Sequence, residues 1–273
     1  MTVVVLVAAA ACASSEHPVA ARRVTPSTAS PGPGPSVTGA PPLTAVVTRC
    51  GPPDVAARTF PVTTSDRIRL AAAEVGTGRR GVVLVPELGS ANLCGWWDYA
   101  AYLAQHGFRV LIFDHRCTGE STCASADRPD GLMLDIAATV ARLKRDGARR
   151  VVLMGASQGA SESLIAGSAT LPIAGIVALS ADELGDDLAT KPYASSAIAA
   201  GSRIRVPTLI AVGGYDPDVT VADTKALAAS VPGSRLVVVP KSFAHGWELL
   251  DVGAGRRPTI SDTVVAFLRS ALS

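Results

Sequence analysis

The chain has 273 residues, a formal net charge of +2 and 48% hydrophobic residues. Its basic residues fall in scattered pairs such as Arg79/Arg80 and Arg149/Arg150, without a basic stripe or interleaved aromatic residues, which argues against a nucleic-acid partner. The cysteines lack the paired spacing of zinc sites, and neither a His-Glu-x-x-His sequence nor a Gly-rich phosphate loop before a lysine occurs. The sequence therefore indicates no metal and no cofactor.

Residues 1–12 form an apolar segment that ends in Ala9-Ala10-Ala11-Cys12. Small residues ahead of a cysteine mark a cleavage site of secretory type, and the segment resembles a bacterial lipoprotein signal, in which Cys12 becomes the lipidated first residue. A transmembrane helix is the weaker alternative, because spanning a bilayer takes about 20 apolar residues. We therefore expect an exported protein on the extracellular face of the membrane, anchored only by a lipid at Cys12, or else secreted.

Residues 13–42 are rich in Ser, Thr, Pro, Gly and Ala and include the run Pro31-Gly-Pro-Gly-Pro35. Such a composition buries too little apolar area to offset the entropy lost on ordering. This segment is therefore predicted to be a tether, and residues 43–273 to form a single domain, whose length of about 230 residues suits one sizeable core.

Four cysteines remain once Cys12 is set aside: Cys50, Cys94, Cys117 and Cys123. An even number of cysteines in an exported chain favours disulfides over reduced thiols, although reduced thiols stay an alternative. Pairing Cys117 with Cys123 in one loop is simplest and leaves Cys50 for Cys94, but the sequence alone permits three connectivities.

Residues 58–63 and 67–75 have strand character and flank the polar turn Thr64-Ser65-Asp66, which predicts a β-hairpin. Beyond it, short runs that are apolar at every position alternate with longer segments of helical periodicity. Such runs suit strands buried on both faces of a parallel sheet. They are residues 82–85, 110–113, 151–154, 176–179, 209–212 and 236–239. The pattern predicts an α/β fold with a mostly parallel sheet of about eight strands, an antiparallel edge formed by the first two, and helices on both faces.

Apolar stripes at helical spacing support the helices between these strands. One stripe comprises Met133, Ile136, Val140 and Leu143, and the other Val264, Phe267, Leu268 and Leu272. Only about thirty residues separate the strands at 176–179 and 209–212, enough for one helix and its loops. We therefore expect no large lid domain and an open active site.

The sequence Gly155-Ala156-Ser157-Gln158-Gly159 stands between a buried strand and a helical segment. A nucleophile needs its oxygen lifted out of the sheet on a sharp strand-to-helix turn, and the flanking glycines let the backbone pack closely there. The alternative is a glycine-rich turn at a helix start. The motif in this context resembles the nucleophile elbow of the α/β-hydrolase superfamily, and the resemblance covers nearly all of the chain from about Thr59 onward. It implies a serine hydrolase with Ser157 as the nucleophile.

A serine hydroxyl needs a base to take its proton, and the family places a histidine after the last strand. Of the four histidines, His17 lies in the tether, His106 at a predicted helix end and His115 upstream of Ser157. His245 follows the last predicted strand, so it is the expected base, with a packing or loop histidine as the alternative.

The base in turn needs a carboxylate to orient it. Asp216 follows the strand at 209–212 and matches the family's acid position. Asp218 could serve instead, and Asp182, after the preceding strand, is a third candidate. Whichever of Asp216 and Asp218 is not the acid is expected to cap the helix that follows.

Acyl transfer also requires two backbone N–H groups aimed at the oxyanion. The resemblance assigns one to Gln158, after the nucleophile, and the other to Leu88, in the loop Pro86-Glu87-Leu88-Gly89-Ser90. Glu87 stands where many relatives have glycine, and it brings a possible negative charge near the oxyanion. We expect its side chain to point away into a hydrogen-bonded support role, the alternative being an altered oxyanion hole.

Two further features are expected to be structural. The sequence from Asp114 to Ser121 resembles the superfamily's Asp-x-Arg-Gly-x-Gly-x-Ser turn, with Cys117 in place of its first glycine. Trp96 and Trp97 could line a substrate pocket, but packing in the core is the better default for such large side chains.

Together these features predict a carboxylesterase-like enzyme that acts on a small acyl substrate through Ser157, His245 and Asp216. The same machinery serves acyltransferases and peptidases. A further alternative is a cell-surface binding protein that kept the fold and lost efficient catalysis, with Glu87 as the sign of that loss.

Overall fold

A computed structural model describes residue 50 and residues 57–87, 89, 92–123, 130–181, 197–250 and 260–273. The predictions for Cys12, the tether, Leu88 and Asp182 fall outside these residues. Within the described part, no helix is long and apolar enough to cross a membrane.

Eight strands form one sheet in the order β1-β2-β4-β3-β5-β6-β7-β8. β2 pairs antiparallel with β1 and with β4, and every other pairing is parallel. The strands are β1 (Ala57–Thr63), β2 (Arg69–Val75), β3 (Arg80–Val85), β4 (Phe108–Phe113), β5 (Arg150–Ala156), β6 (Gly175–Leu179), β7 (Thr208–Gly213) and β8 (Arg235–Val239). The predicted fold class, strand number and antiparallel edge are confirmed.

Burial explains why the central strands are apolar throughout. β6 and β7 are buried at every position, and β3 and β5 at every position after the first, because helices cover both faces of the sheet. The edge strand β1 mixes exposed and buried residues, and β8, at the opposite edge, is mostly half-buried.

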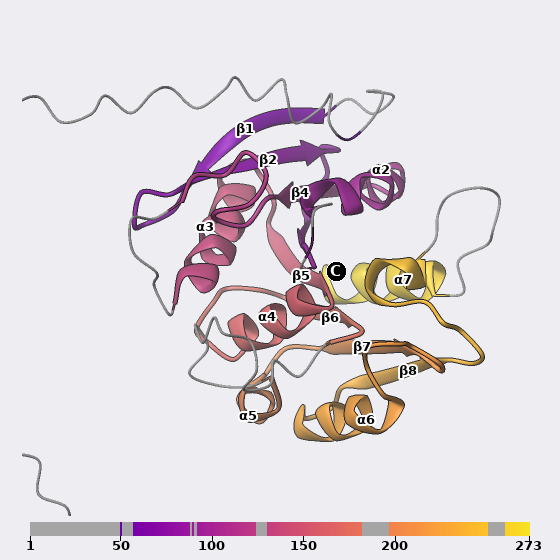
Figure 1. Ribbon diagram of the computed structural model, residues 1–273. Helices are drawn as coiled ribbons and strands as arrows, with labels where there is room; N and C mark the ends of the chain where they lie inside the picture. The colour runs from indigo at the N-terminus through magenta and orange to yellow at the C-terminus, as the bar shows by residue number, and fades with distance from the viewer. Residues whose placement is uncertain are drawn as a thin grey trace, which may run out of the picture. The chain divides into compact units, whose positions relative to one another are not determined.

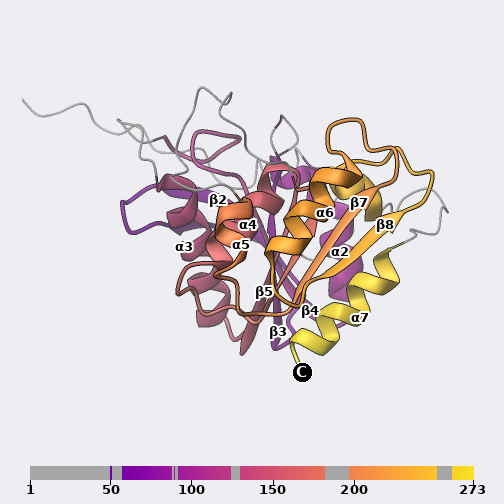
Figure 2. The same cartoon turned by 90° about the horizontal axis from the view of Figure 1, so that it is seen from below.

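The helices divide between the two faces of the sheet (Figures 1 and 2). α2 (Trp97–Gln105) and α7 (Ser261–Ala271) pack on one face; α3 (Gly131–Arg145), α4 (Gln158–Gly167) and α6 (Val221–Ser230) pack on the other, with the short α5 (Ala197–Gly201) beside α4. Two 3₁₀ segments, η1 (Asn92–Trp96) and η2 (Gly246–Leu250), complete the elements. The chain between β6 and β7 contains only α5 within its described part, in line with the expected absence of a large lid.

The cap of α6 corrects one prediction. Neither Asp216 nor Asp218 caps this helix, because the side chain of Thr220 accepts the backbone N–H of Asp223 at 3.1 Å. Threonine is a favoured N-cap residue, and it lies directly ahead of the first helical residue. Asp216 and Asp218 both precede Thr220 in the loop after β7, so neither serves as the cap.

Disulfides join Cys50 to Cys94 and Cys117 to Cys123, the pairing expected as simplest. Cys117 has a φ of +63°, a conformation that favours glycine, so the cysteine adopts the backbone shape of the residue it replaces in the turn. Trp96 is fully buried and donates its indole N–H to the carbonyl of Val85 at 3.0 Å. Trp97 is buried as well, so both tryptophans belong to the core.

Candidate active site

Ser157 occupies a sharp turn between β5 and α4. Its φ of +50° and ψ of −122° lie outside the regions that L-residues favour, and its backbone N–H donates to the carbonyl of Leu179 at 2.9 Å. A Cβ on Gly155 would collide with the carbonyl of Gly159, and a Cβ on Gly159 with the carbonyl of Pro86. Both flanking glycines are therefore required by close backbone approach, as the motif predicted.

Gln158 begins α4, where the first backbone N–H groups have no partner within the helix. Such N–H groups, together with the positive end of the helix dipole, favour a developing negative charge. The Gln158 side chain donates to the carboxylate of Glu162 at 2.6 Å, one turn along the helix. Gln158 thus lies directly after Ser157 at the amino end of α4, with its side chain bonded to Glu162 in the same helix, and its oxyanion role stays a prediction.

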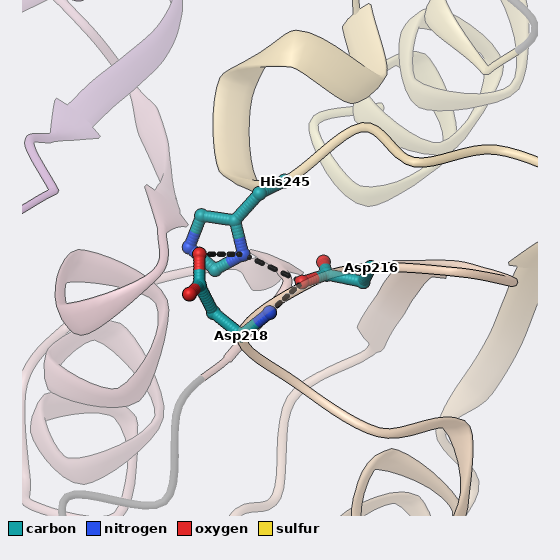
Figure 3. A group of neighbouring side chains, drawn as sticks. All are labelled: Asp216, Asp218 and His245. Carbon is teal, nitrogen blue, oxygen red and sulfur yellow. Dashed lines mark hydrogen bonds and ion pairs between the residues drawn. The ribbon is translucent and has the colours of Figure 1, made fainter.

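The structure brings His245 and Asp216 together from the loops that follow β8 and β7 (Figure 3). Nδ1 of His245 lies 2.9 Å from Oδ1 of Asp216, whose side chain is fully buried. The same oxygen accepts the backbone N–H groups of Asp218 and Val219, and Oδ2 accepts the hydroxyl of Ser180 at 2.6 Å. Asp216 is therefore a fixed acceptor that can orient the imidazole.

Asp218 is the weaker candidate for the acid. Its carboxylate lies 3.7 Å from Nδ1 of His245, and its side chain is 67% exposed. The ligand atoms of Asp216, Asp218 and His245 lie within 4.8 Å of one another, a spacing that a metal could use. Oδ1 of Asp216 already has three hydrogen-bond partners, His245 and the N–H groups of Asp218 and Val219, and Oδ2 accepts the hydroxyl of Ser180. The arrangement thus fits an orienting acid better than a metal ligand.

The nucleophile turn and the histidine loop are in contact. A Cβ on Gly246 would stand 3.3 Å from the Cβ of Ala156, and these two residues directly adjoin His245 and Ser157. Gly246 also has a φ of +55°, so glycine is needed there for its conformation. The three predicted residues Ser157, His245 and Asp216 thus belong to neighbouring loops at one edge of the sheet.

Glu87 follows β3 and lies against the histidine loop. A Cβ on Gly246 would collide with Oε2 of Glu87, so the carboxyl group lies directly against the residue after His245. Desolvation by burial raises the pKa of Glu87 to about 7, although the nearby His245 lowers it. The side chain therefore packs against the loop that carries His245, and its hydrogen-bonded support role stays a prediction.

A buried charge cluster behind the nucleophile turn was missed by the sequence analysis. Nε2 of His115 lies 3.0 Å from Glu162, and Nδ1 lies 3.9 Å from Asp135. Desolvation lowers the pKa of His115, but the Glu162 and Asp135 carboxylates more than offset it and raise the pKa to about 10. Asp135 also holds Arg116, which pairs with Asp66. The hydrogen bond from Gln158 to Glu162 connects this cluster to the predicted oxyanion residue.

The sequence contained one signal for this cluster. Glu162 is a lone charge within the otherwise apolar and small-residue segment of α4, and buried carboxylates require a partner.

Two exposed aromatic side chains flank the site. Tyr215 immediately precedes Asp216, Phe243 lies two residues before His245, and their rings lie 5.2 Å apart. Their exposed fractions are 54% and 73%. An apolar surface is thus available beside the predicted acid and base.

The fold and sequence pattern match one family. The model of the alpha/beta hydrolase family matches residues 82–266. No curated protein matches the chain. Similar solved structures include an esterase from Pyrococcus furiosus, with 20% identity and a TM-score of 0.65 over 81% of this chain and 92% of that one.

Two more solved structures share the fold. A thermophilic esterase from Thermogutta terrifontis is 20% identical with a TM-score of 0.61, over 79% of this chain and 100% of that one. The enol-lactonase from Burkholderia xenovorans is 16% identical with a TM-score of 0.60, over 78% of this chain and 99% of that one. Because the family model covers more than half of its residues, the chain belongs to the alpha/beta hydrolase family.

Proposed function

We propose that the chain is a serine hydrolase that cleaves a carboxylester or a related acyl bond. The observation that carries the proposal is the hydrogen bond between His245 and the buried Asp216, beside a serine held at a positive φ. Family membership supports hydrolase chemistry, and the esterases and the enol-lactonase among the similar structures favour an ester substrate. The exposed rings of Tyr215 and Phe243 suit an apolar acyl or alcohol group.

The proposed reaction has two steps. The hydroxyl of Ser157 attacks the acyl carbon while Nε2 of His245 takes its proton, and Asp216 accepts the hydrogen bond from Nδ1 of the resulting imidazolium. Backbone N–H groups of Gln158 and Leu88 hold the tetrahedral oxyanion. His245 returns the proton to the leaving alcohol. In the second step His245 takes a proton from a water that attacks the acyl-enzyme, and it returns this proton to Ser157 as the carboxylic acid leaves.

Covalent labelling of the full chain by a fluorophosphonate tests the nucleophile. We expect the wild-type chain to be labelled and Ser157→Ala to be unlabelled, because the probe reacts only with an activated serine. Ser168→Ala, at the other end of α4, is the matched control and should be labelled like the wild type. A folded wild type that takes up no label would refute the enzyme proposal and favour a binding protein of the same fold. Label retained by Ser157→Ala would refute the assignment of Ser157 as the nucleophile.

Rates on ester, amide and acyl-acceptor substrates then separate esterase, peptidase and transferase chemistry.

The resemblance of residues 1–12 to a lipoprotein signal supports a second proposal, that the enzyme is exported and held outside the membrane by a lipid on Cys12. Expression of the full chain in a bacterium supplied with radiolabelled palmitate tests it. We expect the wild-type chain to incorporate label in the membrane fraction and Cys12→Ser to incorporate none. An unlabelled wild type recovered in the culture medium would instead identify a secreted protein.

A further inference from the structure

Glu87 has too few partners for a buried carboxylate. Its Oε2 is buried and makes no hydrogen bond among the described residues. An ionised carboxylate offers about four acceptor sites, and a buried oxygen without a donor is costly when charged. A neutral carboxylic acid fits this position better than a carboxylate.

Two of the three charged groups near Glu87 disfavour its ionisation, as its burial does. The carboxylates of Glu248 in η2 and of Asp218 in the loop after β7 raise the pKa of Glu87, whereas His245 lowers it. η1, the next element along the chain, carries no charged side chain. Burial is the strongest of these influences, and the pKa of Glu87 is raised from 4.5 to about 7.

Glu87 also adjoins the residues of the proposed reaction. Its carboxyl group lies against Gly246, which follows His245 and touches Ala156, the residue before Ser157. In the sequence, Glu87 directly precedes Leu88, whose N–H group is proposed to hold the oxyanion. A charge on Glu87 would therefore lie close to the proposed oxyanion site, where a second negative charge is unfavourable.

We infer that Glu87 takes part in acyl transfer as a neutral carboxylic acid that packs against the histidine loop and adds no negative charge near the oxyanion. Glu87 is a positioning residue in this scheme, since it acts through the loop that carries His245. The inference rests on the proposed function for its kinetic consequence. Its statement about protonation can be tested without turnover.

The pH dependence of kcat/KM for an ester tests the kinetic part. Activity requires neutral His245 and neutral Glu87, so the wild type should give a bell-shaped profile whose alkaline limb falls about tenfold per pH unit above neutrality. Glu87→Gln keeps the shape and stays neutral, so its activity should rise to a plateau and not fall at high pH. Glu248→Gln removes a neighbouring charge that raises the pKa of Glu87, so this variant should keep the bell shape with its alkaline limb moved to lower pH. An alkaline limb unchanged in Glu87→Gln would overturn the inference.

Infrared difference spectra between pH 5 and pH 9 test the protonation directly. The wild type should lose a protonated-carboxyl band near neutrality that Glu87→Gln lacks. The absence of such a band in the wild type would overturn the inference.

Thermal melting adds a second check. Because the folded pKa exceeds the unfolded one, Glu87 stabilises the fold at low pH, and this contribution is lost as the pH rises through about 7.

The melting temperature of Glu87→Gln relative to the wild type should therefore increase from pH 5 to pH 8, and a constant difference would contradict the inference. If the folded wild type neither hydrolyses esters nor binds the fluorophosphonate, the proposed function fails, while the spectra and melting curves still decide the state of Glu87.

Discussion

Asp216→Ala is expected to lower kcat for ester hydrolysis by about 10⁴-fold, whereas Asp218→Ala lowers it by less than about tenfold. The difference follows from burial and distance. The side chain of Asp216 is fully buried and lies 2.9 Å from the imidazole, while the exposed Asp218 carboxylate is 3.7 Å away and screened by water. Steady-state kinetics of both variants, with circular dichroism to verify folding, make the comparison. A larger loss in Asp218→Ala than in Asp216→Ala would transfer the role of the acid to Asp218.

Asp216→Asn refines the same test. The oxygen that faces His245 also accepts two backbone N–H groups, so the amide of the variant should turn its oxygen, not its nitrogen, toward the imidazole. The imidazole then keeps its tautomer and loses only the charge that stabilises the imidazolium. We therefore expect an Asn variant with activity between those of the wild type and Asp216→Ala. Activity no higher than that of Asp216→Ala would contradict this account of the hydrogen bonds.

His115→Leu is expected to reduce the free energy of unfolding by about 3–5 kcal/mol, because it leaves the buried charges of Glu162 and Asp135 without the imidazolium between them. Urea denaturation measures the loss. The control is His106→Gln, which changes a partly exposed histidine at the end of α2 and should cost much less. Replacing both His115 and Glu162 by apolar residues should recover part of the loss, because the buried carboxylate that lost the imidazolium is then removed as well.

The pH dependence of this loss has a defined sign. The folded pKa of His115 is raised to about 10 from 6.5, so its stabilising contribution is complete below about pH 6.5 and disappears as the pH rises through about 10. The wild type should therefore approach His115→Leu in stability at high pH. A difference that grows with pH would mean that His115 is neutral in the folded protein.

The sequence predicted the sheet well because its signals are local. Runs such as Val151 to Met154 are apolar at every position, and this pattern depends only on burial of both faces of the strand. The turn at Ser157 was predictable for a similar reason, since two glycines and the change from strand to helix lie within a few residues.

The charge cluster and the state of Glu87 could not be predicted, because they depend on distances between segments far apart in the chain. His115 and Glu162 meet only after β4 and α4 have packed on the same sheet. The choice between Asp216 and Asp218 likewise depends on the path of the loop between β7 and α6. That loop ends at Thr220, which caps α6.

The disulfide between Cys50 and Cys94 has a mechanical consequence. Any pull on the chain ahead of Cys50 reaches Cys94 through a covalent bond, and residues 51–93, with β1, β2 and β3, lie outside the loaded path. Tension is then delivered at η1, beside the buried Trp96, and the edge strands cannot be peeled from the sheet one after another. Chemical reduction of this bond should return the load to β1 and weaken the protein against stretching from its amino-terminal side.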